Sequence, residues 1–165
     1  MSDEGRVAIC PGSYDPVTNG HLDIIGRVSR IFDRVIVGVV DQPLRKQKTL
    51  FTAAERSGFI ERATAELGNV EAKVFSTLLV DFARDNGAST IVKGLRAISD
   101  FEYEFEMNQL NRKLAPEIES AFVMASSEYS FLSSTGIKEL ATFGADIGDL
   151  VPEEVARALS ERIAR

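Results

Sequence analysis

Short apolar runs rich in β-branched residues alternate along the chain with stretches whose apolar positions recur at helical spacing. Five of these runs predict strands, over 7–10, 35–40, 70–74, 90–92 and 121–124. The runs are continuous rather than alternately apolar and polar, which indicates strands covered on both faces. Strands that alternate with helices predict an α/β fold, in which a parallel sheet is joined by right-handed crossovers.

The intervening stretches predict amphipathic helices. Apolar residues recur at helical spacing over 22–32, 59–63 and 79–83, and the last two helices are expected over 134–143 and 152–164. No repeat, low-complexity run or linker divides the sequence, so we expect a single domain spanning residues 1–165.

One segment fits two patterns. Apolar residues alternate with glutamates over 101–107, which is a strand pattern, yet helical spacing continues further, to residue 114. Ser99 followed by Glu102 is typical of a helix-capping box. We predict a helix here, with the aromatic pair Phe101 and Phe105 in the core.

Composition and charge limit the class of protein. A chain of 165 residues that is 44% apolar and 27% charged is typical of a globular protein. Its net charge of −6, without a basic tail, argues against a nucleic-acid binder but allows an anionic small substrate. A single cysteine, Cys10, excludes an internal disulfide. Without a signal peptide or an apolar run of membrane-spanning length, a cytoplasmic protein that does not enter membranes is expected.

The loop over 11–21 joins a predicted strand directly to a predicted helix, at the sheet edge where ligands bind in α/β folds. Gly12 allows a ligand to approach the backbone, and Ser13 offers a hydroxyl. His21, the only histidine, falls in the first helical turn, where unpaired N–H groups favour an anion. Alternatively, this segment makes only a tight turn and His21 is a surface or capping residue. The glycine fingerprints of the Rossmann and Walker A loops are absent.

Basic residues follow two other predicted strands. Arg45, Lys46 and Lys48 lie in the loop after the second strand, and Lys93 and Arg96 flank a glycine after the fourth. Such cations reach phosphate oxygens readily, although charges in loops are often only solvated.

A hydroxyl-rich stretch over 129–135 opens the helix predicted from residue 134. Its serines and threonine are suited either to helix capping or to a second anion site at a helix N-terminus.

These four segments, in this order, resemble those of the bacterial phosphopantetheine adenylyltransferases, and the resemblance covers residues 7–151. Residues 18–21 read T-N-G-H, which is similar to the T/H-x-G-H signature of the nucleotidyltransferase superfamily. Cytidylyltransferases and nicotinate-mononucleotide adenylyltransferases share that signature. The more specific part is its combination with residues 11–16, 93–96, 100–104, 129–131 and 133–134.

The resemblance implies a Rossmann-like nucleotidyltransferase fold, with a five-stranded parallel sheet, helices on both faces and a C-terminal helical part. It implies a homohexamer that transfers the adenylyl group of ATP to 4′-phosphopantetheine, giving dephospho-coenzyme A and pyrophosphate. This is the penultimate step of coenzyme A biosynthesis. Mg²⁺ would be held mainly through the ATP phosphates.

The resemblance also implies roles for individual residues. The catalytic set would be Ser13, His21 and one or both of Arg45 and Lys46, since the loop that carries these two cations looks longer than in relatives. The ATP-binding set would be Ser13, Tyr14, His21, Gly94, Leu95, Arg96, Glu104, Tyr129, Ser130, Phe131, Leu132, Ser133, Ser134 and Thr135. The phosphopantetheine-binding set would be Ser13, Arg45, Lys46, Leu79 and Lys93.

Two alternative functions remain. One is a transferase of adenylyl or cytidylyl groups that uses another phosphate acceptor. The other is a nucleotide-binding or sensor module without catalysis, which has no need for both His21 and the phosphate-binding cations.

Overall fold

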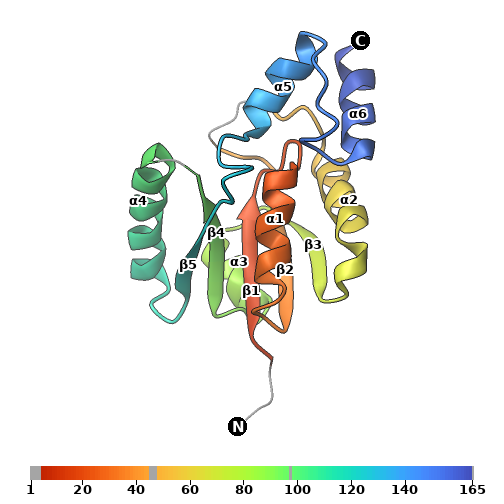
Figure 1. The fold of residues 1–165 in the computed structure, drawn as a ribbon. Coiled ribbons are helices and arrows are strands. Elements are labelled where there is room, and N and C mark those ends of the chain that lie inside the picture. Colours follow the sequence, from red (N-terminus) through yellow and green to blue (C-terminus); the bar gives the residue numbers. More distant parts are fainter. Residues whose placement is uncertain (1–4, 45–47, 97, 165) are drawn as a thin grey trace.

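A five-stranded parallel sheet forms the centre of the computed structural model, which describes residues 5–44, 48–96 and 98–164 (Figure 1). The strand order is β3-β2-β1-β4-β5, and every neighbouring pair is parallel. The strands are β1 (Val7–Gly12), β2 (Arg34–Val40), β3 (Val70–Phe75), β4 (Thr90–Leu95) and β5 (Glu119–Met124). The predicted α/β class is therefore confirmed.

Helices lie on both faces of the sheet and beyond its carboxyl edge. They are α1 (Asn19–Val28), α2 (Ala53–Ala63), the short 3₁₀ helix η1 (Ala65–Leu67), α3 (Leu79–Asp85), α4 (Ile98–Leu114), α5 (Ser134–Thr142) and α6 (Glu153–Ile163). Figure 1 shows α5 and α6 beyond the end of the sheet opposite the N-terminus. Within the described ranges, no helix is both long and apolar enough to cross a membrane.

The alternation of side chains along β1 explains why its sequence is continuously apolar. Ala8 and Cys10 pack in the larger buried cluster, with residues of α1 and α2, whereas Ile9 packs in a second cluster with residues of α3. All three side chains are at most 2% exposed. Because both faces of the strand are covered, each position is apolar.

The two C-terminal helices were predicted with nearly correct bounds, but the end of the fourth strand was predicted too early. The segment predicted to follow the fourth strand as a loop, from Lys93 to Leu95, continues β4, because its backbone pairs with β5 up to Leu95↔Met124. A polar and a glycine position interrupt the apolar run there, so hydrophobicity alone ends the strand too early.

The helix predicted around residues 101–114 is confirmed as α4, but it begins at Ile98, before Ser99. The side chain of Ser99 lies outside the described residues, so its predicted capping role stays a prediction. Phe101 and Phe105 are stacked on each other but are 50% and 53% exposed, so their predicted place in the core is wrong. The helix stands at the outer side of β5, where this chain covers only part of its surface (Figure 1).

Candidate active site

The order in which strands are added to the sheet reverses between β1 and β4. From β1 the chain adds β2 and then β3 on one side, and from β4 it adds β5 on the other side. In doubly wound sheets, ligands bind at the carboxyl ends of the strands on either side of such a switch point. Four of the segments singled out by sequence leave the sheet at this edge, after β1, β2, β4 and β5. The topology therefore brings together what the sequence separates by more than a hundred residues.

His21 is held at the start of α1 by a reciprocal capping box. The backbone N–H of Thr18 donates to Nδ1 of His21 at 3.0 Å, and the backbone N–H of His21 donates to the Thr18 hydroxyl oxygen at 3.3 Å. Because a peptide N–H can only donate, Nδ1 is the unprotonated nitrogen, and the neutral ring keeps its proton on Nε2. The ring is thus fixed at a helix N-terminus, as a donor suited to an anion.

Tyr14 supports the histidine from inside the first loop. Its ring meets the His21 ring edge-on, with 5.0 Å between centroids, and its hydroxyl donates to the carbonyl of Cys10 at 2.9 Å. The side chain is only 6% exposed, and burial raises the pKa of the phenol well above its ordinary value. Tyr14 is therefore a neutral support for the ring of His21.

Lys93, which lies in β4, and Arg96, which follows it, have different partners. Nζ of Lys93 lies 2.7 Å from Oε2 of Glu104 on α4, and both side chains are largely shielded from solvent. Arg96 instead donates to the carbonyl of Leu132 at 2.8 Å, which ties the end of β4 to the hydroxyl-rich segment. The two predicted sites, for phosphopantetheine and for ATP, therefore share one short stretch of chain.

The three serine hydroxyls of residues 129–135 make hydrogen bonds to the backbone of the chain. Ser133 caps α5 by accepting from the backbone N–H of Gly136 at 3.0 Å, and Ser134 donates to the carbonyl of Pro16 at 2.7 Å. Ser130 donates to the carbonyl of Ser127 at 3.1 Å. The segment thus starts a helix and attaches it to the first loop.

Arg56 is a buried arginine that our sequence reasoning missed. It is 0% exposed, and its guanidinium donates to four backbone carbonyls, those of Ser13, Val40, Asp41 and Phe51. Burial lowers the pKa of the guanidinium, and the charges of Asp15 and Asp41 oppose that effect. The available signal was its spacing, because Arg56 falls on the same helical face as Phe59 and Ile60.

Asp15 is a second buried charge at the same place. Its two oxygens accept from the backbone N–H groups of Leu50 and Phe51, each at 2.9 Å, and Nζ of Lys138 lies 3.1 Å from Oδ2. The carboxylate is 0% exposed. Asp15 therefore connects the first loop to the start of α2 and, through Lys138, to α5.

The remaining predicted residues have simpler positions. Gly94 lies in β4, where an added side-chain carbon would meet Cγ1 of Ile24 in α1 at 3.1 Å, so glycine lets the helix pack closely. Leu79 is the half-buried first residue of α3, and Thr135 is exposed in the first turn of α5. Arg45 and Lys46 lie outside the described residues.

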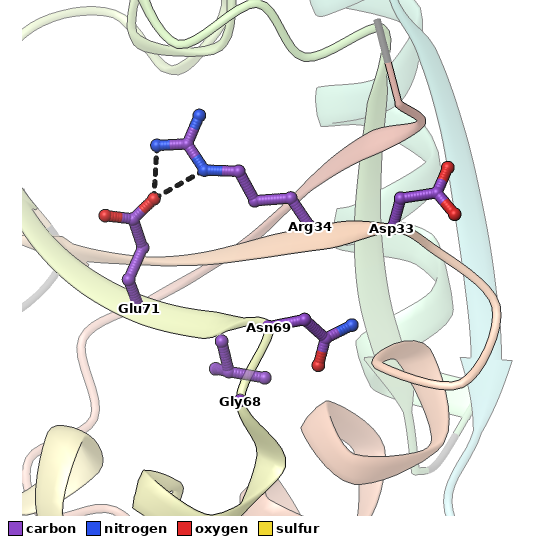
Figure 2. Close-up of a pocket in the computed structure, with 6 residues that line it drawn as sticks. Asp33, Arg34, Gly68, Asn69 and Glu71 are labelled. Carbon is purple, nitrogen blue, oxygen red and sulfur yellow. Dashed lines mark hydrogen bonds and ion pairs between the residues drawn. The ribbon is translucent and has the colours of Figure 1, made fainter. Parts of the chain in front are cut away.

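A hollow of about 340 Å³ lies at the opposite end of the sheet, where β2 and β3 begin (Figure 2). Its lining includes the Arg34–Glu71 ion pair and Asn69, whose amide donates to the carbonyls of Ser29 and Phe32. Each of these polar side chains therefore has a partner within the protein. None of the four segments described above lines this hollow, so the carboxyl edge is the candidate site.

The carboxyl edge can bind phosphates and neutralise their charge. It combines the N-termini of α1 and α5 with the side chains of His21, Lys93 and Arg96. Over the part of the chain that the structure describes, no group of three His, Cys, Asp or Glu side chains could hold a metal ion.

Comparisons with known proteins show the family to which this chain is related. A family model described as cytidylyltransferase-like matches residues 9–140. The chain is 54% identical over 160 residues to the phosphopantetheine adenylyltransferase of Rubrobacter xylanophilus, covering 97% of this chain and 96% of that protein. It is 51% identical to the enzyme of that name from Alkaliphilus metalliredigens, covering 95% and 99%, and 49% identical to that from Clostridium tetani, covering 95% and 97%.

Solved structures support the fold. A bifunctional NMN adenylyltransferase/ADP ribose pyrophosphatase from Francisella tularensis, complexed with AMP and a Mn ion, aligns with 97% of this chain at a TM-score of 0.66 and 14% identity. A second structure of that protein aligns with 98% of the chain at a TM-score of 0.70. The chain spans about half the length of these two solved chains, 52% and 50%. At this identity the likeness concerns the fold alone.

Proposed function

Because this chain belongs to the phosphopantetheine adenylyltransferases of the cytidylyltransferase-like family, we propose that the carboxyl edge of its sheet is where adenylyl transfer takes place. The enzyme transfers the adenylyl group of ATP to 4′-phosphopantetheine, giving dephospho-coenzyme A and pyrophosphate, a step of coenzyme A biosynthesis. The observation that carries the placement is the fixed position of His21 at the start of α1, beside the switch point of the sheet.

The reaction needs positioning and charge neutralisation more than covalent help. An oxygen of the 4′-phosphate attacks the α-phosphorus of ATP, a new P–O bond forms, and the bond to the bridging oxygen of pyrophosphate breaks in line with it. The attacking phosphate is already ionised, so no general base is required. Two polyanions repel each other, and an acidic protein that gathers its cations at one edge offsets that repulsion.

We assign the residues by position at this edge. Nε2–H of His21 donates to the ATP phosphates, and Ser13 contacts both substrates. Lys93 binds the phosphate of phosphopantetheine, and Leu79 lies along its arm. The ATP site is completed by Gly94 to Arg96, by Glu104 and by the hydroxyl-rich segment 129–135. One of Arg45 and Lys46 contacts the transferring phosphate. Two observations support this assignment. The segments leave the sheet at the same edge, and hydrogen bonds join Ser13, Arg96 and Ser134 to neighbouring segments there.

The divalent cation comes with the nucleotide in this proposal. Mg²⁺ prefers oxygen ligands and is commonly held by substrate phosphates together with few protein carboxylates. We therefore assign Mg²⁺ mainly to the ATP phosphates; among the described residues, no group of three His, Cys, Asp or Glu side chains could hold a metal ion.

We further propose that the enzyme works as a homohexamer in the cytoplasm. Its α4 helix exposes two pairs of large apolar side chains one turn apart, Phe101 with Phe105 and Leu110 with Leu114, each residue about half exposed. A helix that is apolar on opposite sides is typically covered on both. Further copies of the chain would supply that cover, and an ATP-consuming reaction fits a cytoplasmic location.

The test is product formation with defined substrates. Pyrophosphate release is measured with ATP or CTP, with phosphopantetheine present or absent, and the product mass is determined. We expect release only with ATP and phosphopantetheine together, and the mass of dephospho-coenzyme A. Turnover with CTP, or with another acceptor only, would establish the alternative transferase. Binding of ATP without any turnover would establish a sensor module.

A further inference from the structure

The chain that leaves β5 passes along one face of α1 on its way to α5 (Figure 1). Three positions of α1, spaced by three and four residues, form a row along that face: Gly20, Asp23 and Arg27. Their contacts on the passing chain come in the reverse order: Tyr129, Ser126 and Met124. The passing chain therefore runs towards the start of α1, where His21 lies.

Asp23 makes the central contact of this row. Its Oδ2 accepts from the hydroxyl of Ser126 at 2.6 Å and lies 3.3 Å from Nη1 of Arg27. The same Nη1 donates to the carbonyl of Met124 at 2.7 Å. The Asp23 side chain is only 23% exposed, which favours a strong hydrogen bond to its charged oxygen. Asp23 and Arg27 thus hold two positions of the same short stretch of chain.

The position of Ser126 is transmitted along the following residues. The backbone N–H of Tyr129 donates to the carbonyl of Ser126 at 2.9 Å, and that of Leu132 donates to the carbonyl of Tyr129 at 3.0 Å. Tyr129 lies against the first turn of α1, since a side-chain carbon added to Gly20 would meet its Cβ at 3.3 Å. At the far end, Arg96 binds the carbonyl of Leu132. The stretch 126–132 is therefore set by α1 at one end and by the end of β4 at the other.

An acidic residue and an arginine four positions later on a helix usually form a solvated pair that adds little to stability. The pair of Asp23 and Arg27 differs, because each partner also binds the chain that leaves β5. These bonds join the helix that begins at His21, assigned to the ATP phosphates, to the segment 129–135, assigned to the same nucleotide. They therefore set the distance between two parts of one ATP site.

We propose that Asp23 is a positioning residue for ATP binding, which holds the segment 129–135 in place relative to His21 through its hydrogen bond with Ser126. The inference rests on the proposed function and deepens it. It assigns Asp23 no contact with either substrate: its effect passes through the backbone that follows Ser126.

The experiment measures the binding of ATP and of phosphopantetheine separately, by calorimetry, in D23A, S126A and the double variant D23A/S126A. We expect D23A to weaken ATP binding ~10-fold, about what one hydrogen bond to a charged group contributes, and to leave phosphopantetheine binding unchanged. The double variant should lose no more than D23A alone, because the same bond is already absent. An equal loss for both substrates, or losses that add in the double variant, would show a merely structural role and overturn the proposal.

Two further variants separate the hydrogen bond from the charge. D23N keeps an oxygen that can accept from the Ser126 hydroxyl, so it should retain most of the ATP affinity. A D23N protein as weak as D23A would show that the charge alone matters and would overturn the proposal. E153A is the matched control, since it removes an acidic residue with an arginine four positions later on α6, and it should leave the binding of both substrates unchanged.

Backbone hydrogen exchange tests the inference without any turnover. The amides of Tyr129 and Leu132 should exchange faster in D23A and S126A than in wild type, and at the wild-type rate in E153A. Unchanged exchange would overturn the proposal even if the wild type makes dephospho-coenzyme A. If the wild type binds ATP without making product, the proposed function fails, and the exchange rates and ATP affinities still decide this inference. If D23A does not fold, S126A removes the same bond from its other side and is read in the same way.

Discussion

The ammonium group of Lys93 lies 2.7 Å from Oε2 of Glu104, and the two side chains are only 20% and 18% exposed. That oxygen is shielded from solvent, and the contact is an ion pair without the alignment of a hydrogen bond. The cation assigned to the phosphate of phosphopantetheine therefore already has a counter-charge. An incoming phosphate must share Lys93 with Glu104.

Replacing Lys93 with alanine should weaken phosphopantetheine binding much more than ATP binding. Loss of the cation leaves the Glu104 carboxylate uncompensated beside a dianion, and breaking a buried charge pair typically costs at least ~2 kcal/mol, or about 30-fold in Kd. Calorimetry with each substrate separately measures this. The double variant K93A/E104Q should recover part of the loss, because it also removes the repelling charge. An equal loss for both substrates, or a loss for ATP alone, would contradict the assignment.

Replacing His21 with alanine should lower kcat by ~10²–10³-fold, the usual effect of removing one donor to a transition state. H21A also removes the capping box, so its thermal stability should fall modestly. H21Q separates the two effects, because glutamine is a normal partner in a capping box. It should keep the unfolding temperature and still lose kcat. Near-normal turnover in a folded H21Q or H21A enzyme would show that the ring is only structural.

Single alanine variants of Arg45 and Lys46 should show one large and one small loss of kcat/KM. Neighbouring residues in extended chain point in opposite directions, so both are not expected to serve the phosphate equally. We favour Lys46, because a flexible ammonium follows a moving phosphate better than the rigid guanidinium fork. If neither variant nor the double variant loses activity, the loop is not part of the site.

The stability of the fold should fall in acid, partly through Glu55. Hydrogen bonding from the backbone of Thr52, and the nearby Arg162, lower the pKa of Glu55 in the folded chain. The charged form is thus favoured by folding, so the stabilisation is present above the unfolded pKa, near ~4.3, and is lost as the pH falls through the folded value. E55Q should therefore unfold at a slightly lower temperature than wild type at pH 7, by less than ~1 kcal/mol since solvent screens the pair. The difference should shrink as the pH falls through the folded pKa of Glu55, and a difference in thermal melts that stays constant with pH would refute this origin.

A charge placed on α4 should change the oligomeric state. Phe105 is 53% exposed in the single chain, and its ring stacks on that of Phe101. If other copies cover this surface, F105E should convert a hexamer into smaller species by burying an unpaired charge. Light scattering after size exclusion measures the mass. A wild-type monomer, or a hexamer unaffected by F105E, would contradict this interface.

The sequence predicted the sheet and its functional edge because both depend on local patterns. Runs of β-branched residues such as those around Ile9 and Ile36 are apolar at every position only when both faces are covered. Since parallel strands share their carboxyl edge, placing the motifs after the strands was enough to bring them together.

What the sequence could not predict depends on partners without a sequence signature. Arg56 binds four carbonyls, and every residue has a carbonyl, so nothing in the sequence identifies those of Ser13 and Val40. The place of Phe101 was misjudged for a related reason: its spacing indicates a covered side chain, but the described part of this chain leaves it 50% exposed. Lys93 was recognised as a cation, whereas its ion pair with Glu104 depends on where the chain folds α4 relative to β4.

The capping box of Thr18 and His21 fixes the number of residues that separate these two positions of the first motif. Thr18 stands at the residue before the helix and His21 three residues later, the spacing at which a side chain in the first turn reaches back to the preceding backbone. An insertion or deletion of one residue between them would turn the imidazole away by roughly a quarter of a helical turn and remove the side-chain half of the capping box. The spacing of the motif is therefore dictated by helix geometry and not by the length of the substrate, so length changes in a designed variant belong before Thr18 or after the first turn.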